Sequence, residues 1–176
     1  RRRRGRAGPA PFGPGRHEYT PRGRVCVVDE NDIVYLTRGS SVPLRAGTLQ
    51  DELVPAPRQP ALTLTADVAL LFRFAALTYN AHRIHYDHNW VRQEGYSDLV
   101  VHGPLQALMM GELIRRCGDG LVGMQFAYRL VSPMIGPQSF TVLAGEAGVN
   151  AGAEVRDVRG TVTAVSTLSP IGQLPD

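Results

Sequence analysis

The chain has 176 residues, of which 43% are hydrophobic and 20% are charged, a composition typical of a globular protein. All 19 of its basic residues are arginines, so catalysis through a lysine Schiff base is excluded. No run of about 18 apolar residues is present, and no apolar segment follows the basic N-terminus. We therefore expect neither a membrane span nor a secretory signal.

The N-terminal 23 residues are rich in Arg, Gly and Pro, and we expect residues 1–23 to be a disordered basic tail. A polyanion-binding arm is the alternative. The net charge of +3 reflects this tail, because six arginines precede residue 17 with no acid among them. The rest is near neutral, so no nucleic-acid partner is predicted. Because the chain starts at Arg1, we expect a fragment or a processed piece.

Two cysteines, Cys26 and Cys117, fit no zinc spacing and are expected to be reduced thiols in a cytoplasmic protein. The chain has neither a G-x-G-x-x-G motif nor a Walker lysine, so we expect no nucleotide cofactor.

Strand-forming residues flank the acidic stretch at 29–32. Arg24–Val28 and Asp32–Leu36 therefore form either a hairpin or one interrupted strand, and the pattern leaves both open. Arg38–Pro60 contains four prolines and is predicted to be a linker.

Residues 61–66 alternate between apolar residues and threonine, which predicts a short strand. A helix from about Ala66 to Leu77 follows, with Thr65 as its N-cap and Asp67 in its first turn. Its apolar face is expected to consist of Val68, Leu71, Phe72 and Ala75.

The stretch from Leu77 to Gln106 holds four of the five histidines: His82, His85, His88 and His102. Within it, Ile84–Glu94 is predicted to be a short helix ended by Gly95, and Leu99–Val101 is a strand-like apolar run. Polar groups this dense beside core-forming residues indicate a functional site.

Pro104–Arg116 is the clearest helix, with almost no polar face, so we expect it to be buried on all sides. The segments after it are rich in Val and Thr and are separated by turn signals. The expected strands are Met124–Leu130, Ser139–Ala144, Glu154–Val158 and Thr161–Leu168. The predicted class is α+β, an antiparallel meander curling round one helix.

Two blocks carry a family resemblance: Leu-Thr-Tyr-Asn-Ala-His-Arg-Ile-His-Tyr-Asp at 77–87 and Val-His-Gly-Pro-Leu at 101–105. They resemble the MaoC-like (R)-specific enoyl-CoA hydratases, and within them the 3-hydroxyacyl-thioester dehydratases and itaconyl- or mesaconyl-CoA hydratases. The resemblance implies the hotdog fold, with residues 61–170 as the hotdog domain. Proteins of this subgroup resemble two tandem hotdogs, so residues 24–60 are expected to be the remnant of a first hotdog plus a linker.

The resemblance also implies site residues. The family's first block reads Ser-Gly-Asp-x-Asn-Pro-apolar-His, and its Asp and His form a catalytic dyad. The histidine falls on His85, the carboxylate is replaced by Asn80, and the glycine of the second block is Gly103. The family's Asn and Pro become His82 and Arg83, which also depart from the pattern.

Adding water to an enoyl thioester needs a base for the water, a proton for Cα and stabilisation of the enolate-like oxygen. His85 is the expected acid or base, because an imidazole titrates near pH 6.5. The Gly103 N–H, at a helix start, is expected to donate to the thioester oxygen. Asn80 is expected to orient the water or the imidazole. Asp87 is a further carboxylate, but two residues from His85 on a helix it would point elsewhere.

The roles of the remaining candidates stay open. His102 is either a substrate-binding residue or a cap before the helix, and Arg83 and Arg92 are candidates for holding the thioester's carrier. The spacing of His82, His85 and His88 permits a metal site, but no Cys or carboxylate set completes it, so none is predicted.

Two functions remain possible. The first is a hydro-lyase acting on a short or branched enoyl or 3-hydroxyacyl thioester, with CoA as the expected carrier and acyl carrier protein as the alternative. The second is a non-catalytic, partner-dependent hotdog half-module. Either way we expect a homodimer or a hotdog heteropartner.

Overall fold

The computed structural model describes residues 4–5, 8–9, 12–34 and 46–172, and the chain divides into two compact units, Arg1–Val42 and Pro43–Asp176. The division falls inside the predicted linker, part of which lies outside the described residues. No helix in the described ranges is long and apolar enough to cross a membrane.

The first unit consists of two antiparallel strand pairs. β1 (Arg4–Gly5) pairs with β2 (Gly8–Pro9), and β3 (Phe12–Tyr19) pairs with β4 (Val27–Val34). The 3-10 turn η1 (Pro21–Gly23) lies between β3 and β4. Of the two alternatives for residues 24–36, the single strand is the closer, because β4 continues through the acidic stretch.

The structure differs from the expected disordered tail at Phe12–Tyr19, which is a strand. The cross-strand register explains the difference, because it places Arg16 opposite Glu30 and His17 opposite Asp29. Arg16 makes ion pairs with both Glu30 and Glu18. Opposite charges directly across an antiparallel pair are favourable, so the pair of Arg16 and Glu30 supports the pairing of β3 with β4.

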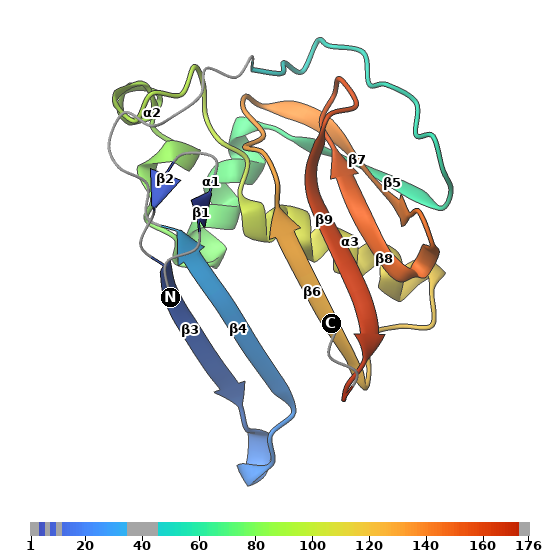
Figure 1. Ribbon diagram of the computed structural model, residues 1–176. Helices are drawn as coiled ribbons and strands as arrows, with labels where there is room; N and C mark the ends of the chain where they lie inside the picture. Colours follow the sequence, from blue (N-terminus) through green and yellow to red (C-terminus); the bar gives the residue numbers. More distant parts are fainter. Residues whose placement is uncertain (1–3, 6–7, 10–11, 35–45, 173–176) are drawn as a thin grey trace. The chain divides into compact units, whose positions relative to one another are not determined.

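The second unit is built on a five-stranded antiparallel sheet in the order β5-β7-β8-β9-β6 (Figure 1). Four of the predicted strands are confirmed, with small differences in their bounds: β5 (Ala61–Ala66), β6 (Met124–Leu130), β7 (Gln138–Gly145) and β9 (Val162–Pro170). The strand expected at Glu154–Val158 is wrong in its bounds, because β8 (Gly148–Arg156) begins six residues earlier and ends two residues earlier. β5 and β6 are the two edges, each with one strand neighbour among the described residues.

Helix α3 (Gly103–Cys117) packs against β6, β7, β8 and β9, and the sheet curves around it (Figure 1). This arrangement is the hotdog fold, and the class is α+β as predicted. The buried side of the helix carries Leu105, Gln106, Ala107, Met110, Leu113 and Ile114. The expectation of burial on all sides is wrong for Leu108, which is 60% exposed.

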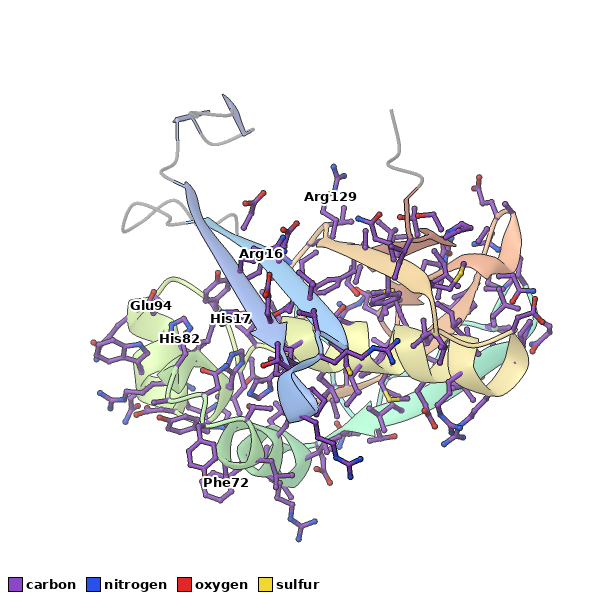
Figure 2. The ribbon with its side chains drawn as sticks, turned by 90° about the horizontal axis from the view of Figure 1, so that it is seen from below. Arg16, His17, Phe72, His82, Glu94 and Arg129 are labelled. Carbon is purple, nitrogen blue, oxygen red and sulfur yellow. The ribbon has the colours of Figure 1, made fainter. Side chains whose placement is uncertain are left out.

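Helix α1 (Val68–Leu77) begins two residues later than expected, because Asp67 and not Thr65 caps it. The Asp67 carboxylate accepts a hydrogen bond from the Leu70 N–H at 2.7 Å. Leu71 and Ala75 are buried as predicted, whereas Val68 is half-exposed and Phe72 points away from the sheet (Figure 2).

The predicted helix at 84–94 is two short elements, the 3-10 turn η2 (Arg83–His85) and α2 (His88–Gln93). Asp87 causes the break, because its carboxylate caps α2 by accepting from the N–H groups of Asn89 and Trp90. A residue at an N-cap has non-helical backbone angles, so one helix cannot run through it. α2 ends before Gly95, as predicted.

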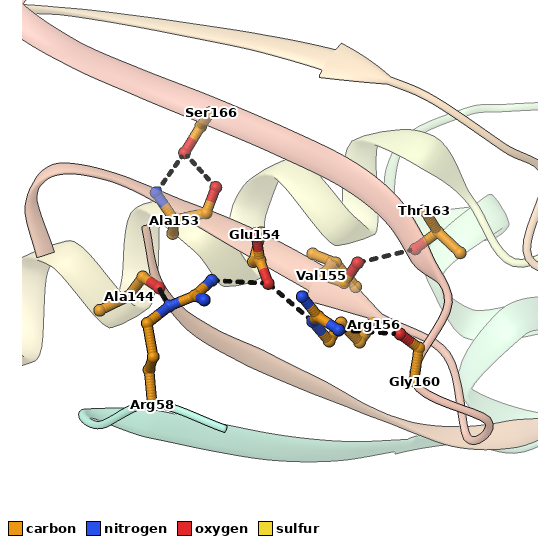
Figure 3. Close-up of polar contacts among 9 residues, drawn as sticks. All are labelled: Arg58, Ala144, Ala153, Glu154, Val155, Arg156, Gly160, Thr163 and Ser166. Atoms are coloured by element: carbon orange, nitrogen blue, oxygen red, sulfur yellow. Dashed lines mark hydrogen bonds and ion pairs between the residues drawn. The ribbon is translucent and has the colours of Figure 1, made fainter. Parts of the chain in front are cut away.

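The described part of the predicted linker is fastened to the sheet by a charged cluster (Figure 3). Arg58 donates to the Ala144 carbonyl at 3.1 Å and forms an ion pair with Glu154 at 2.8 Å. Glu154 also accepts from Arg156 at 2.7 Å, and Arg156 donates to the Gly160 carbonyl. One carboxylate therefore joins two arginines and holds the segment before β5 in place.

Tyr79 occupies a left-handed backbone conformation, with φ of 52°, directly after α1. The Tyr79 N–H bonds to the Ala76 carbonyl and the Asn80 N–H to the Ala75 carbonyl, which is the Schellman arrangement that glycine normally completes. The Tyr79 side chain is 95% exposed. We expect Tyr79→Gly to raise the free energy of unfolding by about 1 kcal/mol, because glycine adopts this conformation without strain.

Urea unfolding at neutral pH measures this change. Tyr79→Ala is the matched control, because alanine removes the ring but keeps the strained backbone, and it should give no such gain. Equal stabilisation by both substitutions would contradict the backbone explanation.

Candidate active site

His85 lies at the end of η2, and its ring is buried. Its Nδ1 atom is 2.7 Å from the Val100 carbonyl oxygen. Because a carbonyl oxygen only accepts, Nδ1 must carry the proton, and Nε2 of the neutral ring is left with a free lone pair. The Val100 N–H in turn donates to the Ile84 carbonyl at 3.0 Å. Two hydrogen bonds therefore join Val100 to the turn at 84–85.

His102 is stacked on His85, with ring centroids 3.6 Å apart and planes inclined by 19°. It has no exposed surface, and the edge of Phe74 packs on it at 4.9 Å. Neither ring nitrogen of His102 has a hydrogen-bond partner among the described residues. The structure therefore places His102 behind His85 in the core, as the residue before α3, and its side chain makes no capping bond.

Both imidazoles are held neutral near neutral pH. Burial lowers the pKa of His85, which the Val100 carbonyl partly offsets, and His82 lowers it further. Burial lowers the pKa of His102 to about 4, with a contribution from His85. Two positive charges on stacked rings would repel each other, so the pair carries at most one positive charge under ordinary conditions.

Asn80 shapes the turn that delivers His85. Its side-chain oxygen accepts from the His82 N–H at 3.0 Å, an Asx-type turn. The His82 ring lies 5.9 Å from that of His85, edge to face, on the segment between α1 and α2 (Figure 2). The Asx turn at 80–82 leads directly into η2, but the hydrogen bond found for the Asn80 side chain goes to the backbone and not to His85.

Gly103 is the first residue of α3, immediately after His102. A Cβ atom at this position would lie 2.2 Å from Cδ1 of Leu130, so any other residue here would require the Leu130 side chain to move. The N–H groups of a first helical turn have no acceptor within the helix, and the dipole makes this end positive. This backbone end can stabilise a developing oxyanion.

Arg83 is engaged within its own turn. It donates to the Asp87 carboxylate at 2.6 and 3.1 Å, and its guanidinium lies 4.5 Å above the centre of the Trp90 ring. The pKa of Asp87 is lowered, first by the Trp90 N–H and then by Arg83. Asp87 therefore points toward α2 and not toward His85, as the sequence predicted.

The three histidines spaced by three residues make separate contacts. His88 lies 3.2 Å from the Asp98 carboxylate, whereas His85 is bonded to Val100. Within the described part of the chain, no group of three or more His, Cys, Asp or Glu side chains is placed to hold a metal ion.

Three residues that contact the candidate site residues could not be named from the sequence: Val100, Phe74 and Leu130. Val100 acts through a backbone carbonyl, which no residue pattern reveals. Phe74 carries the one weak signal, since it lies one residue before the predicted buried position Ala75 on the same helix.

The comparisons with known proteins place these residues in a family context. Residues 9–136 match the family model described as hydroxyacyl-thioester dehydratase type 2. The chain is 38% identical over 170 residues to mesaconyl-C(4)-CoA hydratase of Chloroflexus aurantiacus, covering 96% of this chain and 59% of that protein. It is 28% identical over 134 residues to the mitochondrial hydroxyacyl-thioester dehydratase type 2 of Schizosaccharomyces pombe, covering 74% and 43% respectively.

The chain thus spans about half the length of these curated relatives. Among solved structures, a MaoC-like dehydratase from Phytophthora capsici superposes with a TM-score of 0.63 at 11% identity, over 94% of this chain and 59% of that one. A likeness at this level of identity concerns the fold alone.

The low pKa of His102 makes stability depend on pH. Its ordinary pKa of 6.5 falls to about 4 on folding, so between these values the unfolded chain binds more protons. The free energy of unfolding should therefore be highest above pH 6.5 and fall toward pH 4, by up to about 1.4 kcal/mol per pH unit from this residue.

His102→Leu should flatten this dependence, because the substituted side chain binds no proton. Urea titrations of both proteins at intervals from pH 8 to pH 5, within about the range where histidines titrate, measure the two slopes. Some slope remains in the variant from His85. An unchanged slope would show that His102 is not a neutral buried histidine.

Proposed function

The chain belongs to the hydroxyacyl-thioester dehydratase type 2 family, and from this premise we propose that it is a hydro-lyase acting on a short or branched enoyl thioester. The reaction adds water to the double bond or removes it from the 3-hydroxyacyl form. The observation that carries the proposal is the buried His85, whose Nδ1–H is fixed on the Val100 carbonyl so that Nε2 is the basic atom.

In the hydration direction, Nε2 of His85 takes one proton from water as the water oxygen bonds to Cβ of the enoyl group. The electron pair of the double bond moves onto the thioester oxygen, where the Gly103 N–H and the positive end of α3 stabilise it. The imidazolium of His85 then delivers its proton to Cα, and the neutral ring is restored. Dehydration is the reverse sequence, and neither direction requires a cofactor.

Asn80 assists this sequence by shaping the turn and by offering its amide N–H₂ to the reacting water. His102 supports the histidine from behind. The carrier of the thioester is proposed to be CoA and not acyl carrier protein, which is supported by the likeness to a mesaconyl-C(4)-CoA hydratase. Arg92, which is exposed on α2, is the proposed contact for the phosphates of CoA. Arg83 is the second candidate, because its guanidinium is already paired with the Asp87 carboxylate.

We also propose that the domain works in a pair, either as a homodimer or with a hotdog heteropartner. The outer edge of β6 has no strand partner in the described ranges, and Leu108 of α3 is exposed. The proposed location is the cytoplasm, which agrees with exposed, unpaired Cys26 and Cys117.

His85→Ala should lower kcat for hydration of crotonyl-CoA or mesaconyl-CoA by about 10²–10⁴-fold, because it removes the group that transfers the proton. The loss of the conjugated thioester absorbance measures the rate. His88→Ala is the matched control, since it removes an exposed histidine of the same segment and should leave kcat nearly unchanged.

Near-normal turnover by His85→Ala would contradict the proposal. A folded wild-type chain without turnover on either substrate would instead favour the non-catalytic, partner-dependent module.

The pairing proposal has its own test. The melting temperature of a protein stabilised by self-association rises with protein concentration. We expect such a rise over a hundredfold range of concentration, about what mass action makes measurable, and a smaller rise in Leu108→Glu. A melting temperature independent of concentration would argue against a homodimer.

A further inference from the structure

His102 is poorly suited to its place if its only role is to fill the core. It has no exposed surface, and both ring nitrogens lack partners among the described residues. An unsatisfied buried polar group costs about 1–3 kcal/mol. A leucine would fill similar space without this cost, so the fold alone does not account for the imidazole.

The position of the ring gives it a different role. The His102 ring packs against Phe74 of α1, edge to face with centroids 4.9 Å apart, and stacks on the His85 ring with centroids 3.6 Å apart. The His82 ring in turn packs edge to face with His85, with centroids 5.9 Å apart. Four aromatic rings from α1, the start of α3 and the turn at η2 thus form one ladder, with His85 inside it.

A single hydrogen bond does not fix an imidazole. The preferred values of the χ2 torsion of histidine are broad and roughly two-fold. The hydrogen bond from Nδ1 to Val100 therefore does not by itself fix the angle of the ring plane. A flat ring stacked at 3.6 Å closes off that rotation, because turning His85 would drive its edge into His102. The hydrogen bond and the stacked face together define one orientation.

We propose that His102 is a positioning residue for His85. Its ring holds the His85 imidazole in the plane that keeps Nδ1 on the Val100 carbonyl and directs Nε2 to the substrate. This inference rests on the proposed function of His85 as the base. It assigns His102 no contact with the substrate, because His102 is completely buried in this structure.

The electrostatic surroundings suit this role. His82 and the two stacked rings are the titratable groups found to act on the pair. The neighbouring charges of Arg83 and Asp87 are bonded to each other. His102 stays neutral when His85 gains a proton, so the imidazolium formed during turnover meets an aromatic face and not a second charge.

Two substitutions in the full chain separate stacking from space filling. His102→Phe keeps an aromatic ring but removes both ring nitrogens. His102→Leu introduces an apolar side chain of similar size and removes the stacked ring. The first readout is kcat and KM on crotonyl-CoA and mesaconyl-CoA. The second is nuclear magnetic resonance of the His85 ring, in which the bonded Nδ1–H gives a protected proton signal absent from His85→Ala.

We expect His102→Leu to fold at least as stably as the wild type at pH 8 and yet to lose about 10–100-fold in kcat, the cost of a misplaced catalytic group. KM should change little, because His102 does not touch the substrate. The protected Nδ1–H signal should weaken in His102→Leu and persist in His102→Phe, which should also recover most of kcat.

A kcat for His102→Leu within about twofold of the wild type would overturn the proposal, and so would an unchanged Nδ1–H signal in this variant. A His102→Phe variant as impaired as His102→Leu would also overturn it, because an aromatic stack would then not be enough to position His85. The resonance measurement needs no turnover. If the wild-type chain is inactive, the proposed function fails, whereas the positioning of His85 is still decided by this signal.

Discussion

The structure of the site depends on the exchange of hydrogen bonds between the turn at 84–85 and Val100. The Val100 N–H reaches the Ile84 carbonyl, and the Val100 carbonyl receives the His85 ring. One residue thus fixes both the backbone of the histidine turn and the tautomer of its imidazole. Because Val101 and His102 follow Val100 directly, the same two hydrogen bonds also fix His85 close to the start of α3.

This tie satisfies polar groups that the hotdog core would otherwise leave buried and unpaired. The Leu99–Val101 run is buried, but it belongs to none of the five strands of the main sheet and makes one isolated bridge, between Val100 and Ile135. Beyond the bonds of Val100 to the turn, the Val101 N–H donates to the Met134 carbonyl, and the Leu99 carbonyl accepts from the Gly136 N–H. The Leu99 N–H donates to the Asp98 carboxylate. A buried segment outside the sheet is stable only when such partners exist, so the turn that carries His85 is also part of what completes the core.

Local patterns were enough to predict the main elements of the second unit. The apolar residues of α3, the glycine before Pro104 and the alternating strands from Met124 onward all predicted the elements that formed. The failures came where a single side chain or a distant strand decided the outcome. The capping bonds of Asp67 and Asp87 moved one helix start and divided one helix, and the pairing with β4 made a strand of residues 12–19.

The site followed the same division. His85, Asn80 and Gly103 could be named as candidate site residues because residue type and order carry the family resemblance. The carbonyl of Val100 and the packing of Phe74 and Leu130 were not, because they depend on which segments meet in space. His102 was noticed by type, but only the stacked geometry and complete burial show that it lies behind His85.

The replacement of a carboxylate by Asn80 can be understood from these surroundings. An aspartate could make the same bond to the His82 N–H, so the turn itself does not require asparagine. What asparagine changes is charge: a carboxylate beside buried imidazoles would favour their protonated forms and raise their pKa values. With the amide, burial acts on His85 with less opposition, and the ring stays neutral at neutral pH. A neutral, oriented imidazole is the form that can take a proton from water, so the loss of the dyad carboxylate is compatible with a histidine that works as the base.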